Sequence, residues 1–182
     1  NQPWILTANG TILTYEKKGI IPGLLERWYA ERKELQARKK DATTAKDIAF
    51  WDKRQLVKKI NLNSLYGAIL NPGCRFFDKR IGQSTTLTGR SIAKHMDAYL
   101  NECITGEYDH VGKSVIYGDT DSCYFSAWPA LKEEVESGRM AWSKETCIAL
   151  YDSLADQVNA SFPAFMEQAF HCPDRKSTRL NS

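Results

Sequence analysis

Val115-Ile-Tyr-Gly-Asp-Thr-Asp-Ser-Cys-Tyr-Phe-Ser126 is the stretch that decides the fold. Its two ends, Val115–Tyr117 and Cys123–Ser126, have the composition of strands, and the residues between them favour a hairpin turn. In an extended geometry Asp119 and Asp121 face the same way, because side chains two residues apart lie on one face of a strand. The stretch therefore predicts a β-hairpin with two carboxylates at its bend.

Two carboxylates held close together repel each other, and the pKa of one must rise unless a cation lies between them. Mg²⁺ is the natural cation, since it takes hard oxygen ligands from one or two carboxylates and the rest from substrate phosphates and water. A solvated turn is the alternative, because Gly, Asp, Thr and Ser all form turns. An EF-hand loop is excluded by Cys123 and Tyr124, which stand where it needs Asp or Asn and then Gly.

Two helical segments precede the acidic stretch. Leu24 to about Lys40 and about Lys46 to Leu65 have helical periodicity, and a short turn with capping residues joins them. They predict an antiparallel helical hairpin. The second helix carries a polar stripe within an arc of about 80°, made of Gln55, Lys59, Asn63 and Tyr66.

The chemistry of this stripe suits a nucleotide. Lys59 can meet phosphate as a point charge, Asn63 can hydrogen-bond a base or sugar edge, and Tyr66 offers a flat face to a base pair. On the first helix Arg32 and Lys39 lie two turns apart on one face, and Arg32 can make a bidentate contact to phosphate. A solvated helix face is the alternative interpretation of the stripe.

The other segments mix strands and helices without a regular βαβ repeat, which predicts the α+β class. Short strands flank Asn9-Gly10, and Phe76–Phe77 is expected to be extended. A helix is expected over 85–100. A second begins after Ser143 and buries one apolar stripe, made of Cys147, Tyr151, Leu154 and Val158.

Composition narrows the class of protein. The chain has 182 residues with 42% hydrophobic and 26% charged residues, which excludes an intrinsically disordered chain. No apolar run approaches the length of a membrane span. The last nine residues, 174–182, resemble a translated sequencing adapter, and without them 22 basic and 21 acidic residues remain. Global charge therefore says little about partners.

Two signatures resemble those of family B DNA polymerases, most closely the bacteriophage enzymes. Lys59-Ile-Asn-Leu-Asn-Ser-Leu-Tyr-Gly67 is similar to the K-x-x-x-N-S-x-Y-G motif of the fingers, and Tyr117–Ser122 is similar to the Y-G-D-T-D-S motif of the palm. Arg75–Asp78 resembles the R-Y-Y-D segment, and Thr88–Arg90 resembles the T-x-x-G-R segment. The resemblance covers about residues 10 to 126.

The resemblance implies a fold in which an antiparallel-sheet palm with packed helices holds an inserted two-helix antiparallel fingers hairpin. The expected bounds are 1–23 and 71–173 for the palm, 24–70 for the fingers, and 174–182 for the adapter-derived tail. The catalytic Asp of the upstream palm strand, the exonuclease and the thumb are expected outside this chain, so we expect the isolated fragment to be inactive.

The resemblance also implies a role for each motif residue. Asp121 and Asp119 would be the catalytic, metal-binding carboxylates for two Mg²⁺ ions. The nucleotide-binding residues would be Arg32, Lys59, Asn63 and Tyr66, and the DNA-binding residues would be Arg75 and Arg90. Gln36 departs from the family, which commonly has a basic residue there, and Lys39 or Lys40 is the candidate replacement.

The implied activity is template-directed nucleotidyl transfer from a dNTP to a primer 3′-hydroxyl in DNA replication. The implied partners are primer–template DNA and dNTPs, with a sliding clamp and replisome proteins as further candidates and no membrane. A phage-encoded enzyme would act in the cytoplasm of an infected bacterial host.

Two alternatives of other classes stay open at this point. A metal-dependent glycosyltransferase would use Asp119-Thr-Asp121 as its D-x-D motif and should show a βαβ-type sheet. A non-catalytic, nucleic-acid-binding helical module would explain the polar stripe but leaves the acidic turn unexplained, because carboxylates repel phosphate.

Overall fold

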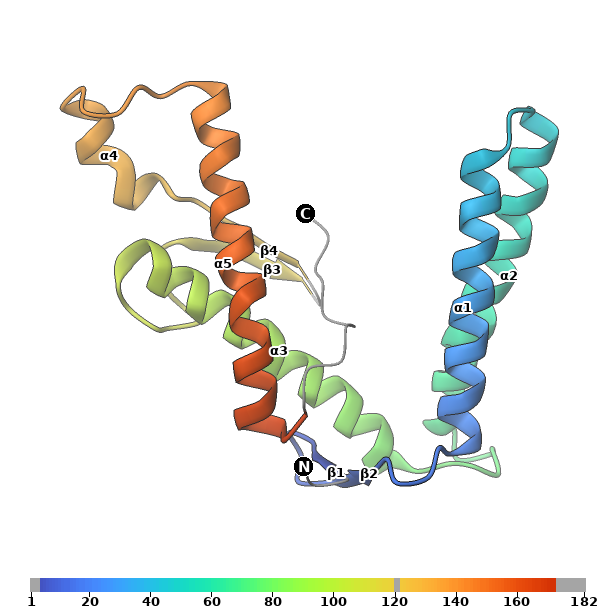
Figure 1. Cartoon of the computed structure of the whole chain (residues 1–182). Helices are drawn as coiled ribbons and strands as arrows, with labels where there is room; N and C mark the ends of the chain where they lie inside the picture. Colours follow the sequence, from blue (N-terminus) through green and yellow to red (C-terminus); the bar gives the residue numbers. More distant parts are fainter. Residues whose placement is uncertain (1–3, 120–121, 173–182) are drawn as a thin grey trace. The chain divides into compact units, whose positions relative to one another are not determined.

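Long helices joined by short connections make up most of the chain, and the computed structural model describes residues 4–119 and 122–172. In chain order the elements are β1 (Trp4–Leu6), β2 (Ile12–Thr14), α1 (Ile20–Asp41), α2 (Ala45–Ile69), α3 (Lys79–Thr105), β3 (Val115–Asp119), β4 (Ser122–Phe125), α4 (Trp128–Glu136) and α5 (Lys144–Phe170). The strands form two small antiparallel sheets, β1 with β2 and β3 with β4 (Figure 1). The predicted α+β class is confirmed.

The contacts divide the chain into two units, one formed by Thr14–Gln83 and the other by Asn1–Leu13 with Ser84–Ser182. The palm and fingers bounds expected from the sequence stay predictions, and the expected tail, 174–182, lies outside the described residues. Among the described residues, no helix combines the length and apolar character that a membrane span requires.

The unit Thr14–Gln83 contains the predicted helical hairpin, α1 packed side by side with α2 (Figure 1). The backbone N–H of Asp47 donates to the Oγ1 of Thr44 at 3.1 Å, which caps the start of α2. α1 begins at Ile20, four residues earlier than predicted. Pro22 is tolerated there because the N–H groups of the first helical turn have no intrahelical partner.

The connection from α2 to α3 differs from the prediction. Residues 71–78 form successive turns, in which Cys74 N–H donates to Asn71 O at 2.9 Å and Phe77 N–H donates to Cys74 O at 3.1 Å. The expected extended piece at Phe76–Phe77 is therefore wrong. α3 begins at Lys79, six residues before the predicted start, and the carboxylate of Asp78 accepts from the N–H of Arg80 at 2.8 Å in its first turn.

The other unit has its core where α3, α4 and α5 meet. The buried apolar side chains are Met96, Leu100, Ala127, Leu131, Leu154, Val158 and Phe162, and Phe125 of β4 packs against them. The predicted cap of α5 is confirmed, since Thr146 N–H donates to the Oγ of Ser143 at 3.2 Å. The predicted stripe is confirmed at Leu154 and Val158, which are both buried. This core fixes α3 and the β3–β4 hairpin within one unit.

A buried asparagine shapes the approach to β3. Asn101, on α3, is 1% exposed. Its Nδ2 donates to the carbonyl of Glu107 at 2.8 Å, and its Oδ1 accepts from the N–H of Ser114 at 3.3 Å. A Cβ at Gly112 would lie only 2.0 Å from the Asn101 side chain, so the loop passes directly over it. Asn101 therefore hydrogen-bonds to the backbone near both ends of the loop that leads from α3 to the acidic hairpin.

A buried histidine joins α3 to α5. The Nε2 of His95 lies 3.0 Å from the Oγ of Ser161, and its Nδ1 lies 2.8 Å from the hydroxyl of Tyr108. Because Ser161 donates its own proton to Val158 O at 2.8 Å, it accepts from Nε2–H, which makes Nδ1 the acceptor from Tyr108. The ring also stacks on Phe165 at 4.0 Å. These contacts favour the neutral imidazole, and burial lowers the pKa of His95.

Candidate functional site

The acidic stretch forms the antiparallel hairpin of β3 and β4, as predicted. Gly118 pairs with Cys123 and Asp119 pairs with Ser122, so Asp119 ends β3 directly before the turn. Asp121 lies outside the described residues. The two paired strands thus lie on either side of residues 120–121, and the metal-binding roles of Asp119 and Asp121 stay predictions.

A further carboxylate, that of Asp97 on α3, lies against this hairpin. A Cβ built on Gly118 would be 3.5 Å from the Oδ2 of Asp97. Burial, and then a hydrogen bond with Asp97, raise the pKa of the Cys123 thiol to about 12. The Oδ1 of Asp97 is buried and has no hydrogen-bond partner within the described part of the chain. Nothing in the sequence motifs points to Asp97, because only the packing of α3 against the hairpin brings it there.

A groove of about 540 Å³ runs between α3 and the acidic hairpin. Its lining comprises Thr85, Thr86, Gly89, Arg90, Ala93, Lys94, Asp97, His110, Gly118 and Ser122. Arg90 and Lys94 are exposed and one turn apart on α3, so two cations lie along one wall. Glycines and small side chains therefore share the lining of the groove with two cations, Arg90 and Lys94, and one carboxylate, Asp97.

The polar stripe of the other unit faces α1 at its centre. Arg32 Nε donates to the Oε1 of Gln55 at 3.3 Å, and Gln55 Nε2 donates to Asp52 Oδ1 at 3.0 Å. Arg32, on α1, therefore reaches the stripe of α2 at Gln55. Lys59 and Asn63 are exposed, and Lys59 has no ion-pair partner among residues 4–119 and 122–172. Arg32 and Lys59 therefore lie close to the amide of Gln55, and neither cation pairs with a carboxylate among the described residues.

Tyr66, at the end of the stripe, has its hydroxyl engaged. It donates to the carbonyl of Gly82 at 3.1 Å, on the first turns of α3. Gly82 is buried, and a Cβ there would lie 1.9 Å from the Cδ2 of Leu70. The ring of Tyr66 is half-buried and its hydroxyl is held by this bond, and the expected contact of the ring with a base pair stays a prediction.

The two arginines expected to meet DNA are exposed. Arg75 lies in the turns between α2 and α3, and Arg90 lies on α3 at the wall of the groove. Nearby, the Arg80 side chain pairs with Asp78 at 3.1 Å, and its hydrogen bond holds the pKa of the Asp78 carboxyl below the ordinary value. Arg75 has no such ion-pair partner within the described residues.

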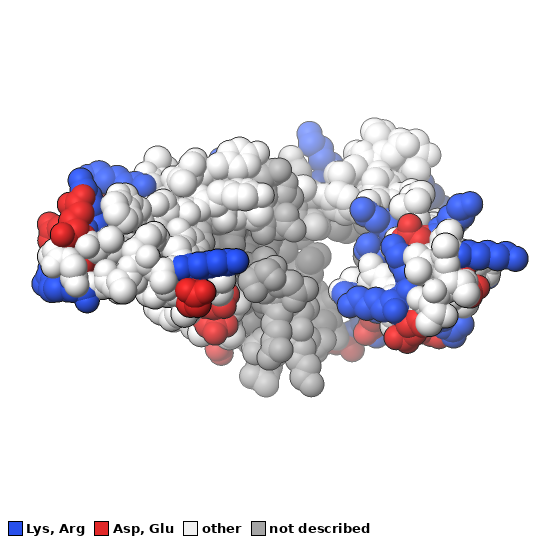
Figure 2. Space-filling view, turned by 90° about the horizontal axis from the view of Figure 1, so that it is seen from above, with Lys and Arg blue, Asp and Glu red and all other residues white. Residues whose placement is uncertain are grey.

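Figure 2 shows Lys and Arg side chains around the α1–α2 hairpin, with Asp and Glu among them. Ion pairs across the two helices order this surface: Lys39 pairs with Asp52 at 2.7 Å, and Lys58 pairs with Glu31. The fold and these side chains define a class of protein, an α+β chain with an acidic β-hairpin and a cationic helical hairpin.

Residues 7–145 match the profile of DNA polymerase family B, and the chain belongs to this family. The chain is 38% identical over 108 residues to the DNA polymerase delta catalytic subunit of Oryza sativa subsp. japonica, covering 58% of this chain and 10% of that protein. It is 34% identical over 128 residues to the Glycine max subunit of the same name, covering 69% and 12%. It is 32% identical over 111 residues to a DNA polymerase of Red sea bream iridovirus, covering 61% and 11%.

Among solved structures, the family B DNA polymerase of the archaeon Pyrobaculum calidifontis matches with a TM-score of 0.53 at 25% identity, covering 74% of this chain and 17% of that chain. The chain thus spans about a tenth of the length of the curated relatives named above. These proteins come from plants, a virus and an archaeon, so they do not single out a bacteriophage source. Neither sheet in the described residues is of the βαβ type that the glycosyltransferase alternative predicted.

Proposed function

We propose that this chain is part of a template-directed DNA polymerase that transfers a nucleotidyl group from a dNTP to the 3′-hydroxyl of a primer. The chain's membership in DNA polymerase family B and the names of its relatives support this. The structural observation that carries the proposal is the contact of Arg32 with Gln55, because it places an arginine beside the stripe that holds Lys59.

In this proposal the helical hairpin binds the incoming nucleotide. Lys59 and Arg32 hold the triphosphate, since both cations lack a carboxylate partner in the described structure and guanidinium and ammonium groups suit phosphate. Asn63, exposed on the next turn of α2, and the ring of Tyr66 line the pocket of the new base pair. The bond from Tyr66 to Gly82 would keep that ring in place.

The reaction itself forms one bond and breaks another. The 3′-hydroxyl oxygen of the primer attacks the α-phosphorus, the bond from that phosphorus to the oxygen of the β-phosphate breaks, pyrophosphate leaves, and the hydroxyl proton passes to solvent. Asp121 and Asp119 would hold Mg²⁺, for which carboxylate oxygens are suitable ligands, and β3 ends at Asp119 directly before the turn. When bound, two Mg²⁺ ions would acidify the primer hydroxyl and neutralise the leaving phosphates.

The primer–template duplex would be held through its phosphates, because a replicative enzyme must accept any sequence. Arg90 and Arg75, both exposed, are the proposed contacts, and the groove beside Arg90 offers space for an anionic backbone. A sliding clamp, replisome proteins and the cytoplasm of an infected bacterium belong to the same proposal and rest on the motif resemblance alone.

A segment exchange tests the activity. Residues 7–145 of this chain replace the matching segment of the Pyrococcus glycovorans DNA polymerase, to which the chain is 28% identical over 149 residues. We expect primer extension by the chimera, and a loss of at least about a hundredfold in the Asp121→Asn chimera, because the amide is a weaker ligand than the carboxylate for the Mg²⁺ that neutralises the reacting phosphates. A folded chimera whose extension rate is unchanged by Asp121→Asn would overturn the proposal.

A binding measurement on the 182-residue chain covers the case in which the chimera fails to fold. Titration with dATP in MgCl₂, followed by calorimetry, should show binding that Lys59→Gln weakens and Lys53→Gln does not. Both lysines are exposed on α2, but Lys53 lies outside the stripe. Equal effects of the two substitutions would count against the nucleotide-binding role of the stripe.

A further inference from the structure

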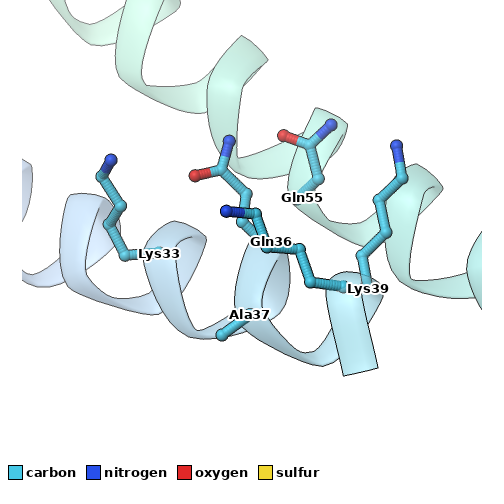
Figure 3. Close-up of a pocket in the computed structure, with 6 residues that line it drawn as sticks. Lys33, Gln36, Ala37, Lys39 and Gln55 are labelled. Carbon is cyan, nitrogen blue, oxygen red and sulfur yellow. The ribbon is translucent and has the colours of Figure 1, made fainter. Parts of the chain in front are cut away.

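A groove of about 610 Å³ lies between α1 and α2. Its lining comprises Glu31, Glu34, Leu35 and Arg38 of α1 with Trp51, Arg54, Val57 and Lys58 of α2. The pocket in Figure 3 also lies between these two helices, but lysines, amides and Ala37 line it, and it shares no residue with the groove. The large apolar side chains of Leu35, Trp51 and Val57 therefore belong to the groove and not to that pocket.

A row of exposed residues on α2, here called the outer row, continues the surface of the groove. It repeats at intervals of three, four and three residues and comprises Phe50, Lys53, Val57 and Ile60. At roughly 100° per residue these four side chains lie within an arc of about 80°, the arrangement of a helix that packs against another helix. Val57 is 55%, Ile60 53% and Phe50 48% exposed. Scattered apolar residues are ordinary on a surface, but a row with this spacing beside a groove marks an interaction surface.

The carboxylates of the groove are already neutralised within the hairpin. Glu31 pairs with Lys58 and, at 2.9 Å, with Arg27, and these hydrogen bonds hold the pKa of the Glu31 carboxyl below its ordinary value. Glu34 pairs with Arg38 on the next turn of α1. A molecule that enters the groove therefore meets two carboxylates that each have a cation of their own.

Two cations of the same surface have no such partner. Arg54 lines the groove, and its guanidinium lies 5.3 Å from the ring of Phe50. Lys53 is exposed in the outer row. Within the ranges 4–119 and 122–172, neither of these two cations makes an ion pair. The surface thus combines apolar side chains with positive charge that is not compensated.

We propose that the groove and the outer row together bind an acidic amphipathic helix of a partner protein. The apolar side of that helix packs on Trp51, Val57 and Ile60, and its carboxylates pair with Lys53 and Arg54. A second copy of this chain fits less well, because the unpaired cations of both copies would face each other. This surface does not include Lys59, so partner binding goes beyond the proposed function and can be measured separately from nucleotide binding.

The test uses the full 182-residue chain and two synthetic peptides of about three heptads with Leu at positions a and d. One peptide has Glu at positions e and g, and the other has Lys there; the like charges also oppose self-association of each peptide. Fluorescence anisotropy of the labelled peptides measures both dissociation constants. We expect the Glu peptide to bind at least about tenfold more tightly than the Lys peptide, because like charges that meet in an interface oppose binding.

A pair of substitutions tests the apolar contact. Val57→Ser/Ile60→Ser should weaken binding of the Glu peptide about tenfold or more, because apolar area that the complex would bury is lost. Ile20→Ser/Tyr29→Ser is the matched control, since Ile20 and Tyr29 are exposed on α1, at 81% and 52%, and lie outside this surface. The control pair should change the dissociation constant less than about twofold.

A second pair tests the charge and also covers the case in which the serine variant does not fold. Lys53→Gln/Arg54→Gln should weaken binding of the Glu peptide about fivefold or more. Lys33→Gln/Lys40→Gln removes the same net charge from exposed positions of α1 that do not line the groove, and it should have less than about half of that effect.

Other results would overturn the inference. Equal binding of the two peptides, or of neither, would contradict the acidic partner, and equal weakening by the two charge pairs would reduce the effect to net charge. Sedimentation equilibrium of the chain alone tests the second copy, which would be the occupant if Val57→Ser/Ile60→Ser dissociated a dimer. Displacement of the Glu peptide by a single-stranded oligonucleotide would instead make nucleic acid the occupant.

Discussion

Asn101→Leu should be among the most damaging single substitutions in the unit that holds the acidic hairpin. The side chain is 1% exposed, and it makes two hydrogen bonds to the backbone, with Glu107 and with Ser114. Leucine is similar in volume but can neither donate nor accept. A buried backbone group left without a partner costs about 1–3 kcal/mol, so the loss of both bonds should lower the free energy of unfolding by about 2–5 kcal/mol. That is a large part of the stability of an ordinary domain.

Asn159→Leu is the matched control. Asn159, half-buried on α5, has a buried Oδ1 without a hydrogen-bond partner in the described part of the chain. Its replacement removes a polar atom that is already unsatisfied, and we expect a neutral or slightly stabilising effect. Urea unfolding followed by circular dichroism measures both variants, and the midpoint should fall for Asn101→Leu while the slope stays unchanged. Equal midpoints for the two variants would refute the reasoning from hydrogen-bond satisfaction.

Two further predictions concern buried positions in each unit. Burial lowers the pKa of His95 below its ordinary value of 6.5, so as the pH falls the unfolded chain takes up the proton before the folded chain does. The contribution of His95 to the free energy of unfolding should therefore be complete above pH 6.5 and should decrease as the pH drops below it. In urea unfolding, His95→Phe should remove this pH dependence, whereas replacement of the exposed His110 should not. Gly82→Ala should lower the free energy of unfolding by about 1–3 kcal/mol, because its Cβ would lie 1.9 Å from the Cδ2 of Leu70. Gly89→Ala, with no atom within 4 Å of its Cβ, should instead raise it by roughly 0.5–1 kcal/mol, and equal urea midpoints for the two variants would count against overpacking at Gly82.

Periodicity predicted the helices well where one face is truly buried. The stripe that contains Leu154 and Val158 was read from spacing alone, and both residues lie in the core. α1 has no buried residue, so apolar spacing could not locate its start, and the helix begins at Ile20 rather than Leu24. Phe76–Phe77 looked like a strand by composition, but hydrogen bonds of successive turns satisfy the backbone from Asn71 onward. Local propensity therefore failed where tertiary packing or turn hydrogen bonds decided the conformation.

The candidate site was predictable only in part, for a geometric reason. A single helix defines which residues share its face, so the stripe with Lys59 was accessible from the sequence. The contact of Arg32 with Gln55 could not be predicted from either helix alone, since it depends on how the two helices pack. Asp97 could not be anticipated, because only the packing of α3 against the acidic hairpin brings it there.

In the α1–α2 hairpin, the requirements of ligand binding and of stability oppose each other. Cations that remain free for phosphate cannot also be neutralised by partners, and α1 buries no residue that would compensate. Apolar side chains such as Tyr29 and Val57 are more than half exposed, at 52% and 55%. The ion pair of Lys39 with Asp52 is partly exposed, and such pairs contribute less than about 1 kcal/mol. A ligand that neutralises the free lysines would therefore stabilise the hairpin as well as bind to it, since any ligand of the folded state shifts the folding equilibrium.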